Sequence, residues 1–177
     1  VQGSTISINN PAGSGIDVSR LTVSRSDAGE QTVLHVIGKK SGISYKEKFE
    51  AYNCEIIAKG SQYGIFCSNE ELFSGSSLLF SENTICTAEA SGYDGIALYG
   101  KQFDVLASSV TAAAPNGTSG VTMEQSIYLA ADFIDDVEVP SQLKASSNRG
   151  RAVTAGYKGM GGYITVTNSQ LYGNTEK

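Results

Sequence analysis

One frame of residues recurs three times between residues 49 and 123, and this repeat constrains the fold more than any other feature of the sequence. Each copy has alternating apolar residues, an Asn or Ser, a second alternating run that ends in Ala, a turn, and then Gly followed by Ile or Val. The Asn or Ser recurs at Asn53, Asn83 and Ser109, and the glycine recurs at Gly64, Gly95 and Gly120. A unit of about 30 residues is too small to bury its own apolar face, so the repeat predicts stacked coils that share one core.

Within each copy, the apolar positions alternate with a period of two and change phase at the Asn or Ser. The alternation predicts short strands, and the phase change at Asn53 predicts a tight corner, because Asn tolerates left-handed backbone geometry. Asn residues stacked at this corner are expected to form a ladder along the axis. We therefore predict an all-β, single-stranded right-handed parallel β-helix of about six or seven coils. The pattern of leucine-rich repeats is missing, whereas an immunoglobulin-like sandwich remains an alternative.

Weaker copies of the frame extend the prediction to the rest of the chain. Residues 1–48 carry partial copies, and residues 164–171 match residues 49–56 well. The segment 140–149 is expected to be a polar insertion that interrupts the coil. We predict that residues 1–177 form one β-helix domain of a longer protein. Because an open solenoid end exposes core and strand edges, flanking domains or a covering segment are expected.

Composition and charge exclude some classes of partner. The formal net charge is -5, and no basic run is longer than Lys39-Lys40, so a nucleic-acid partner is not expected. No apolar run approaches the roughly 20 residues of a membrane span, and no signal peptide is visible. The three cysteines at periodic positions are predicted to be small buried residues, and His35, alone in a β-branched strand, is predicted to be structural.

The carboxylates are candidate metal ligands and candidate catalytic groups. Asp132, Asp135 and Asp136 could hold calcium, which takes about six to eight oxygens, although a solvated loop edge is the favoured interpretation. No other cofactor is expected. The residues before the predicted corner read Tyr52, Glu82, Ser108 and Thr167, so no carboxylate pair stacks there, and no Gly-x-Ser-x-Gly occurs. Asp94 stands alone at a turn, and Arg149 and Arg151 near the acidic cluster keep a catalytic alternative open.

Aromatic residues indicate a binding surface. Tyr63 and Tyr93 fall at nearly the same place in successive copies, so they are predicted to stack as a small ladder beside Tyr99. Tyr157 and Tyr163 lie on a glycine-rich segment that is predicted to be a binding loop. Flat aromatic faces beside polar groups suit sugar rings. The alternative interpretation is that these tyrosines merely cover the edges of coils.

The repeated Ser/Asn-x-Ile/Val-x-Ala, turn, Asp/Tyr-Gly-Ile pattern resembles that of the secreted β-helical carbohydrate-binding and adhesin-like surface proteins of bacteria. The resemblance implies a pectate-lyase-like (pectin lyase-like) helix, and in that group some members bind acidic polysaccharide with calcium. The group's Asp-Asp-Gly-Ile turn is here Tyr93-Asp94-Gly95-Ile96.

The resulting functional hypothesis is a non-catalytic binding or adhesion module. We expect it to be secreted or displayed at a cell surface, where it binds polysaccharide or a host or cell-surface glycan. Two alternatives stay open. One is a polysaccharide lyase or glycoside hydrolase with its site on an exposed sheet, and the other is a structural spacer of a surface protein.

Overall fold

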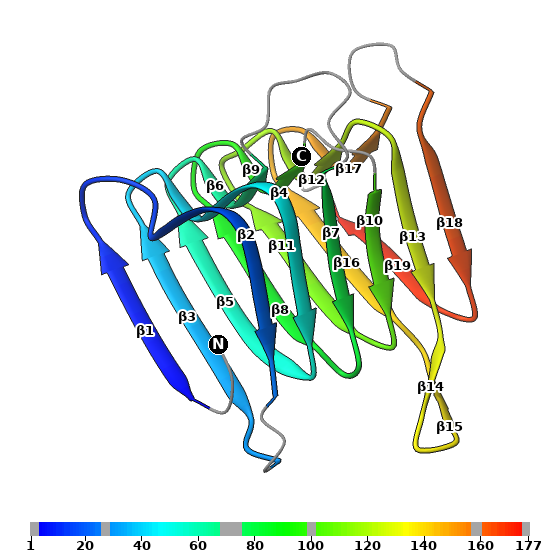
Figure 1. Cartoon of the computed structure of the whole chain (residues 1–177). Coiled ribbons are helices and arrows are strands. Elements are labelled where there is room, and N and C mark those ends of the chain that lie inside the picture. Colours follow the sequence, from blue (N-terminus) through cyan, green and yellow to red (C-terminus); the bar gives the residue numbers. More distant parts are fainter. Residues whose placement is uncertain (1–3, 26–28, 68–75, 99–101, 157–160, 175–177) are drawn as a thin grey trace.

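The computed structural model describes residues 4–25, 29–67, 76–98, 102–156 and 161–174. All regular structure in these residues is β, and the chain winds as a right-handed parallel β-helix. The predicted fold class is therefore confirmed. Figure 1 shows the strands of successive coils stacked side by side from the blue N-terminal end to the red C-terminal end.

The first face of the helix is a seven-stranded parallel sheet, so the chain passes this face seven times. Each strand pairs with the equivalent strand of the coils before and after it. In order, its strands are β1 (Thr5–Asn10), β3 (Thr32–Gly38), β5 (Cys54–Gly60), β8 (Ile85–Ala90), β11 (Ser109–Ala114), β16 (Gln142–Ser147) and β19 (Gln170–Asn174).

A ten-stranded sheet supplies the other two faces, because it bends along the long strands β2 (Ile16–Ser24) and β4 (Ser41–Tyr52). The first part of β4 pairs with β6 and its second part pairs with β7, so each part belongs to a different face. The second face continues with β6 (Tyr63–Cys67), β9 (Asp94–Leu98), β12 (Ser119–Met123) and β17 (Arg151–Ala155). The third face continues with β7 (Ser77–Ser81), β10 (Gln102–Leu106), β13 (Ser126–Ala130) and β18 (Tyr163–Thr167).

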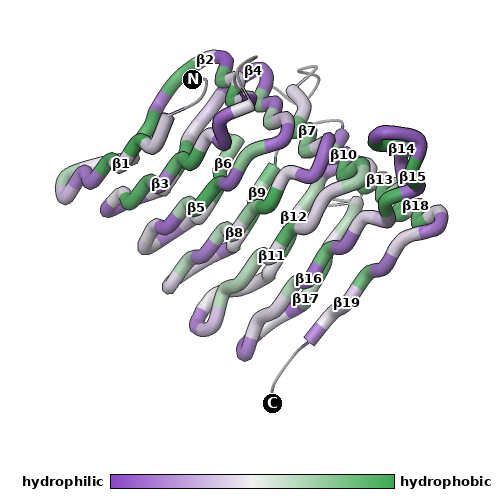
Figure 2. Tube along the Cα trace, turned by 90° about the horizontal axis from the view of Figure 1, so that it is seen from below, coloured by the Kyte–Doolittle hydropathy of each residue, from purple (hydrophilic) through white to green (hydrophobic). Residues whose placement is uncertain are grey.

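The core consists of columns of inward side chains, because the in-register parallel pairing puts equivalent residues directly above one another. On the third face, Phe49, Phe80 and Phe103 are fully buried and pack edge to face, with ring centroids 5.7 and 5.9 Å apart. Figure 2 shows the hydrophobic residues concentrated within the strands. The cysteines Cys54, Cys67 and Cys86 are buried in these columns, as predicted, and none of the three is in a disulfide. Burial raises the pKa of the Cys54 thiol to about 11.

The corner between the third and first faces corrects the predicted asparagine ladder. Asn53 and Asn168 do adopt left-handed geometry, with φ of 46° and 45°. Tyr52 pairs with Ser81, however, so Asn53 is level with Glu82 and Asn83 is an additional residue. In the third copy the left-handed residue is Ala107, with φ of 44°, and the predicted corner residue Ser109 instead begins β11.

A ladder does form at this corner, but small hydroxyl side chains make it. The Thr84 amide donates to Ser108 Oγ at 3.2 Å, the Ser108 amide donates to Ser141 Oγ at 3.3 Å, and the Ser141 amide donates to Ser169 Oγ at 3.0 Å. The ladder therefore links four coils through hydrogen bonds that are buried or partly buried.

The repeated glycine lies where the second face approaches the first. A Cβ added at Gly64 would lie 2.5 Å from the Glu89 backbone nitrogen and 2.6 Å from the Gly95 carbonyl oxygen. Gly42, Gly95 and Gly120 face equally close backbone atoms of neighbouring strands. The sequence repeats Gly here because a side chain has no room at this position.

The prediction of an insertion at residues 140–149 is wrong about where the coil is interrupted. Residues 142–147 form β16, whose Leu143 and Ala145 are buried in the core. The interruption comes earlier, as a hairpin of β14 (Asp132–Ile134) and β15 (Val137–Val139) that extends from the corner after β13 (Figure 1). Polar composition alone suggested a loop, whereas the alternation of buried and exposed residues shows a strand.

Candidate functional site

An aromatic stack marks the second face. Tyr63 begins β6, and Tyr93 immediately precedes β9 in the next coil. Their ring centroids are 5.7 Å apart with an interplanar angle of 21°, so the rings stack as the repeat predicts. Phe66 also stacks on Tyr63, with the two ring centroids 4.3 Å apart. Tyr93 remains 49% exposed, which leaves aromatic surface open to a ligand.

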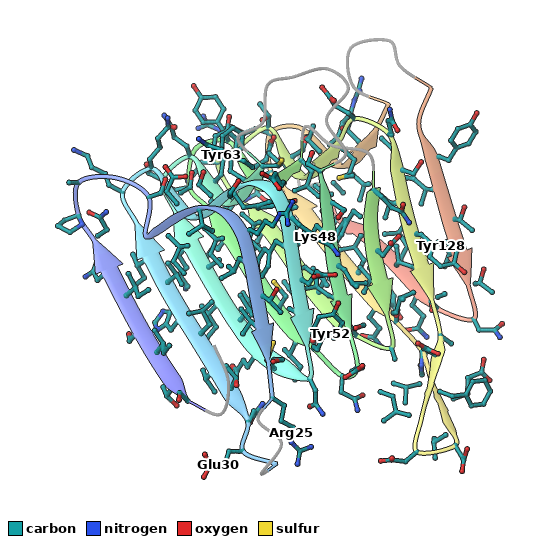
Figure 3. All side chains as sticks on the ribbon, viewed as in Figure 1. Arg25, Glu30, Lys48, Tyr52, Tyr63 and Tyr128 are labelled. Atoms are coloured by element: carbon teal, nitrogen blue, oxygen red, sulfur yellow. The ribbon has the colours of Figure 1, made fainter. Side chains whose placement is uncertain are left out.

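The stacked tyrosines form one wall of a cavity of about 480 Å³ on this face. The lining comes from four successive coils, since Tyr63 is level with Asp94, Asp94 with Ser119, and Ser119 with Arg151. Figure 3 shows Tyr63 at the upper edge of the β-helix, well away from Tyr128 on the third face. The described lining residues are Tyr63, Tyr93, Asp94, Thr118, Ser119, Thr122, Gly150, Arg151 and Thr154.

Asp94 is the acidic group of the cavity, and it is 8% exposed. Burial raises the pKa of its carboxyl above the usual range. Hydrogen bonds from the Thr118 and Thr122 hydroxyls and from the Ser119 amide act in the opposite direction. The Thr118 bond is 2.7 Å long. The 2.7 Å bond from the Thr118 hydroxyl therefore positions Asp94, which does not stand alone as the sequence indicated.

The cavity combines three kinds of recognition group. The tyrosine stack offers an apolar face, Asp94 offers a hydrogen-bond acceptor, and Arg151 offers an exposed cation with several donors. A sugar ring needs this combination, because its C–H face is apolar and its hydroxyls both donate and accept. Asp94 is the single carboxylate among the described lining residues, so they contain no carboxylate pair of the kind that glycoside hydrolysis uses.

The remaining predicted tyrosines do not join this cavity within the described residues. Tyr163 begins β18 on the third face, pairs with Ser126 and is 72% exposed. Tyr99 and Tyr157 lie outside the described residues. Of the five predicted binding tyrosines, the structure thus brings together Tyr63 and Tyr93.

The predicted metal ligands lie on the hairpin. Asp132 is on β14, where its carboxylate accepts a hydrogen bond from the Phe133 amide at 2.8 Å. Asp135 and Asp136 form the turn, both with left-handed backbone geometry. Throughout the part of the chain that the structure describes, no group of three or more His, Cys, Asp or Glu side chains could hold a metal ion. The calcium prediction thus gains no geometric support.

Sequence reasoning missed the contributions of Thr118, Thr122 and Arg151 to the site. The sequence match of Gly95 to Gly120 could have located the first two, because it places Thr118 beside Tyr93 and Thr122 beside Ala97 on the same face. Arg151 was associated with the acidic cluster, whereas the structure places it in the cavity with Asp94. The sequence did not align Arg151 with the earlier coils because residues 140–149 were predicted to be an insertion. In the structure, β17, which carries Arg151, follows directly after β16.

No protein-family model, curated protein or solved structure matches this chain. The described residues also include no helix that is long and apolar enough to cross a membrane. The fold and the geometry of the cavity are therefore the basis for the function proposed below.

Proposed function

We propose that this protein is a non-catalytic module that binds polysaccharide at the second face, as part of a secreted or cell-surface protein. The observation that carries the proposal is the stack of Tyr63 and Tyr93 beside Asp94 and Arg151 in one cavity. An extended glycan suits this surface, because equivalent residues on successive coils repeat at about the 4.8 Å strand spacing. Adhesion to a host or cell-surface glycan would use the same groups.

A catalytic function is the second candidate, and one observation favours it. The pKa of Asp94 is raised by burial, and perturbed carboxyl groups in cavities are common in active sites. Against it, Asp94 lacks a second carboxylate in the described lining, and its hydrogen bond from the Thr118 hydroxyl suits a fixed acceptor better than a proton-transfer group. A spacer function would not require a cavity of this composition.

The test is a glycan array probed with the purified chain, followed by an affinity measurement on each glycan that binds. We expect Tyr93→Ala to weaken binding by about fivefold or more, because aromatic anchors commonly contribute about 1 to 3 kcal/mol. The matched control is Tyr172→Ala on the first face, since both tyrosines are 49% exposed. Binding is expected to survive a calcium chelator, because the described lining has a single carboxylate.

Product analysis then separates binding from catalysis. Incubation of the parent chain with each bound polysaccharide is expected to release neither new reducing ends nor unsaturated products. Cleavage that Asp94→Asn abolishes would replace the proposal with the enzyme alternative. Equal loss of binding in Tyr93→Ala and Tyr172→Ala, or no binding to any glycan, would contradict the proposed site.

A further inference from the structure

A groove of about 330 Å³ lies at the corner between the third and first faces. Its floor follows the column of Ile85, Ser109 and Gln142, which pair in register on three successive strands of the first face. The hairpin of β14 and β15 supplies a wall through Val139 and Pro140. Because β8 and β11 each pair with a strand on both sides, the groove lies within the stack of coils and not at its end.

The hairpin turns an apolar side toward this groove. Val137 lies two residues before Val139 on β15, so both side chains point to the same side. Ile134 is directly opposite Val137 in the antiparallel register and points to that side as well. Glu138 points to the other side, where its carboxylate accepts a hydrogen bond from Asn168 Nδ2 at 2.8 Å. One side of the hairpin is thus fixed to the next coil, and the apolar side borders the groove.

The groups around the groove are open to a partner. Ile85 is 51% exposed and Val137 is 62% exposed. A two-stranded hairpin is at best marginally stable in water by itself, so a contact on its apolar side would stabilise it. The Asn83 amide and the Ser109 hydroxyl, which also line the groove, have no hydrogen-bond partner among the described residues. The groove therefore combines apolar surface with polar groups that can bind the backbone of an extended chain.

The charge around the groove is negative and lacks a compensating cation. Asp132 is opposite Val139, on the groove side of the hairpin, and Asp135 and Asp136 form the turn. The sequence contains no Lys or Arg from residue 102 to residue 143. Ion pairs neutralise several carboxylates elsewhere, but none involves these three aspartates within the described residues.

The arrangement of these carboxylates favours cations that are spaced apart. Throughout the described ranges, no group of three or more His, Cys, Asp or Glu side chains converges as a metal site would require. Separate Lys or Arg side chains along an extended segment match such a distribution better than a single metal ion does. The described lining also contains no aromatic residue, so the groove offers no stacking platform for a sugar ring.

We propose that this groove binds an extended, positively charged segment of a partner protein. An apolar side chain of that segment lies between Ile85 and Val137, in the widest apolar part of the surface. Asn83 and Ser109 hydrogen-bond the backbone of the segment. Lys or Arg side chains that flank the apolar residue reach the aspartates of the hairpin, which supply the charge complementarity.

A peptide array tests the proposal. Each peptide of the test set has one Leu, Ile or Phe between two Lys or Arg residues. Matched peptides have Glu in place of the cations, or Ser in place of the apolar residue. We expect the parent chain to bind the test set and neither matched set. Fluorescence anisotropy then gives the affinity for a bound peptide, which should fall as the salt concentration rises, because exposed ion pairs are screened.

Substitution of the apolar wall locates the bound peptide. Ile85→Ser should weaken the affinity by about fivefold, because the exposed half of the Ile85 side chain would be buried by the peptide. The matched control is Ile37→Ser, since Ile37 is 38% exposed on the same face but lies outside the groove, and this variant should bind like the parent. Circular dichroism checks the fold of each variant. Should Ile85→Ser not fold, Val137→Ser replaces it, with the same expected loss.

Neutralising the hairpin tests the charge complementarity. The double variant Asp135→Asn/Asp136→Asn keeps residue types that tolerate the left-handed geometry of the turn. It should weaken the affinity by about threefold and reduce the salt dependence, as expected for exposed ion pairs. An affinity with unchanged salt dependence would contradict a positively charged partner.

Four further outcomes would overturn the proposal. They are failure of every test peptide to bind, equal binding of the test peptides and the matched sets, equal affinities of Ile85→Ser and Ile37→Ser, and self-association of the parent chain that Ile85→Ser abolishes. The last outcome, measured by sedimentation velocity, would assign the groove to a second copy of the chain. Glycan affinity should be the same in Ile85→Ser and the parent, because the groove and the tyrosine cavity share no described lining residue.

Discussion

At the scale of single residues, burial of the Asp94 carboxyl in the cavity makes its charged form less stable and raises its pKa. An acid whose pKa is raised by folding binds its proton more tightly in the folded state, so the free energy of unfolding falls as pH rises from the unfolded-state pKa through the folded-state pKa. We expect Asp94→Asn to flatten this decline above pH 3.8, as measured by urea unfolding at a series of pH values. Asp17→Asn, at an exposed site, is the control, and an unchanged slope in Asp94→Asn would contradict this interpretation.

The repeated glycine provides a steric test at the same scale. Gly64→Ala forces a Cβ against the Glu89 and Gly95 backbones, and overpacking of this kind costs about 1 to 3 kcal/mol or more. Gly161→Ala is the matched control, because an added Cβ there meets no atom within 4 Å. Urea unfolding should show a large loss of stability for the first substitution and almost none for the second. Equal effects would mean that backbone freedom, rather than space, explains the repeat.

At the scale of elements, the hairpin of β14 and β15 is an addition to a complete coil. Elsewhere the third face joins the first through Leu106-Ala107-Ser108, and deletion of residues 132–140 would recreate that connection as Ala130-Ala131-Ser141. The exposed Phe133 and Val137 contribute little to the core, with 69% and 62% of their surface open. We expect the deletion variant to keep its circular dichroism spectrum and its glycan affinity.

The same deletion decides the calcium question. It removes Asp132, Asp135 and Asp136 together, so a calcium-dependent affinity that disappears with the hairpin would assign the metal to these residues. We expect titration calorimetry with calcium to show no difference between the parent and the deletion variant. The described residues contain no convergent set of ligands, which is the reason for this expectation.

At the scale of the whole molecule, position along the stack decides how much an apolar side chain contributes. Leu129 and Val166 share one core column, but the first is fully buried and the second is 41% exposed at the open end. Leu129→Ala should therefore reduce the free energy of unfolding by about 2 to 5 kcal/mol, and Val166→Ala by less than about 1 kcal/mol. Urea unfolding measures both. A loss at Val166 as large as that at Leu129 would indicate that the end is covered in solution.

The sequence by itself determined the coil and much of its register. The period, the alternation and the repeated Gly-Ile or Gly-Val predicted the parallel β-helix, and the match of residues 164–171 to residues 49–56 agrees with the pairing. These signals are strong because every coil meets the same packing requirement at the same position. The tyrosine stack followed from the same alignment.

Tertiary structure alone decided where the frame shifts and which polar groups meet. One additional residue at Asn83 and the hairpin before β16 displaced the predicted register, because a corner tolerates an extra residue without any change in the alternation of its neighbours. The cavity depends on that register, since Tyr63, Asp94 and Arg151 come from separate coils. Side chains so distant in sequence become neighbours through strand pairing, and local patterns do not encode that distance.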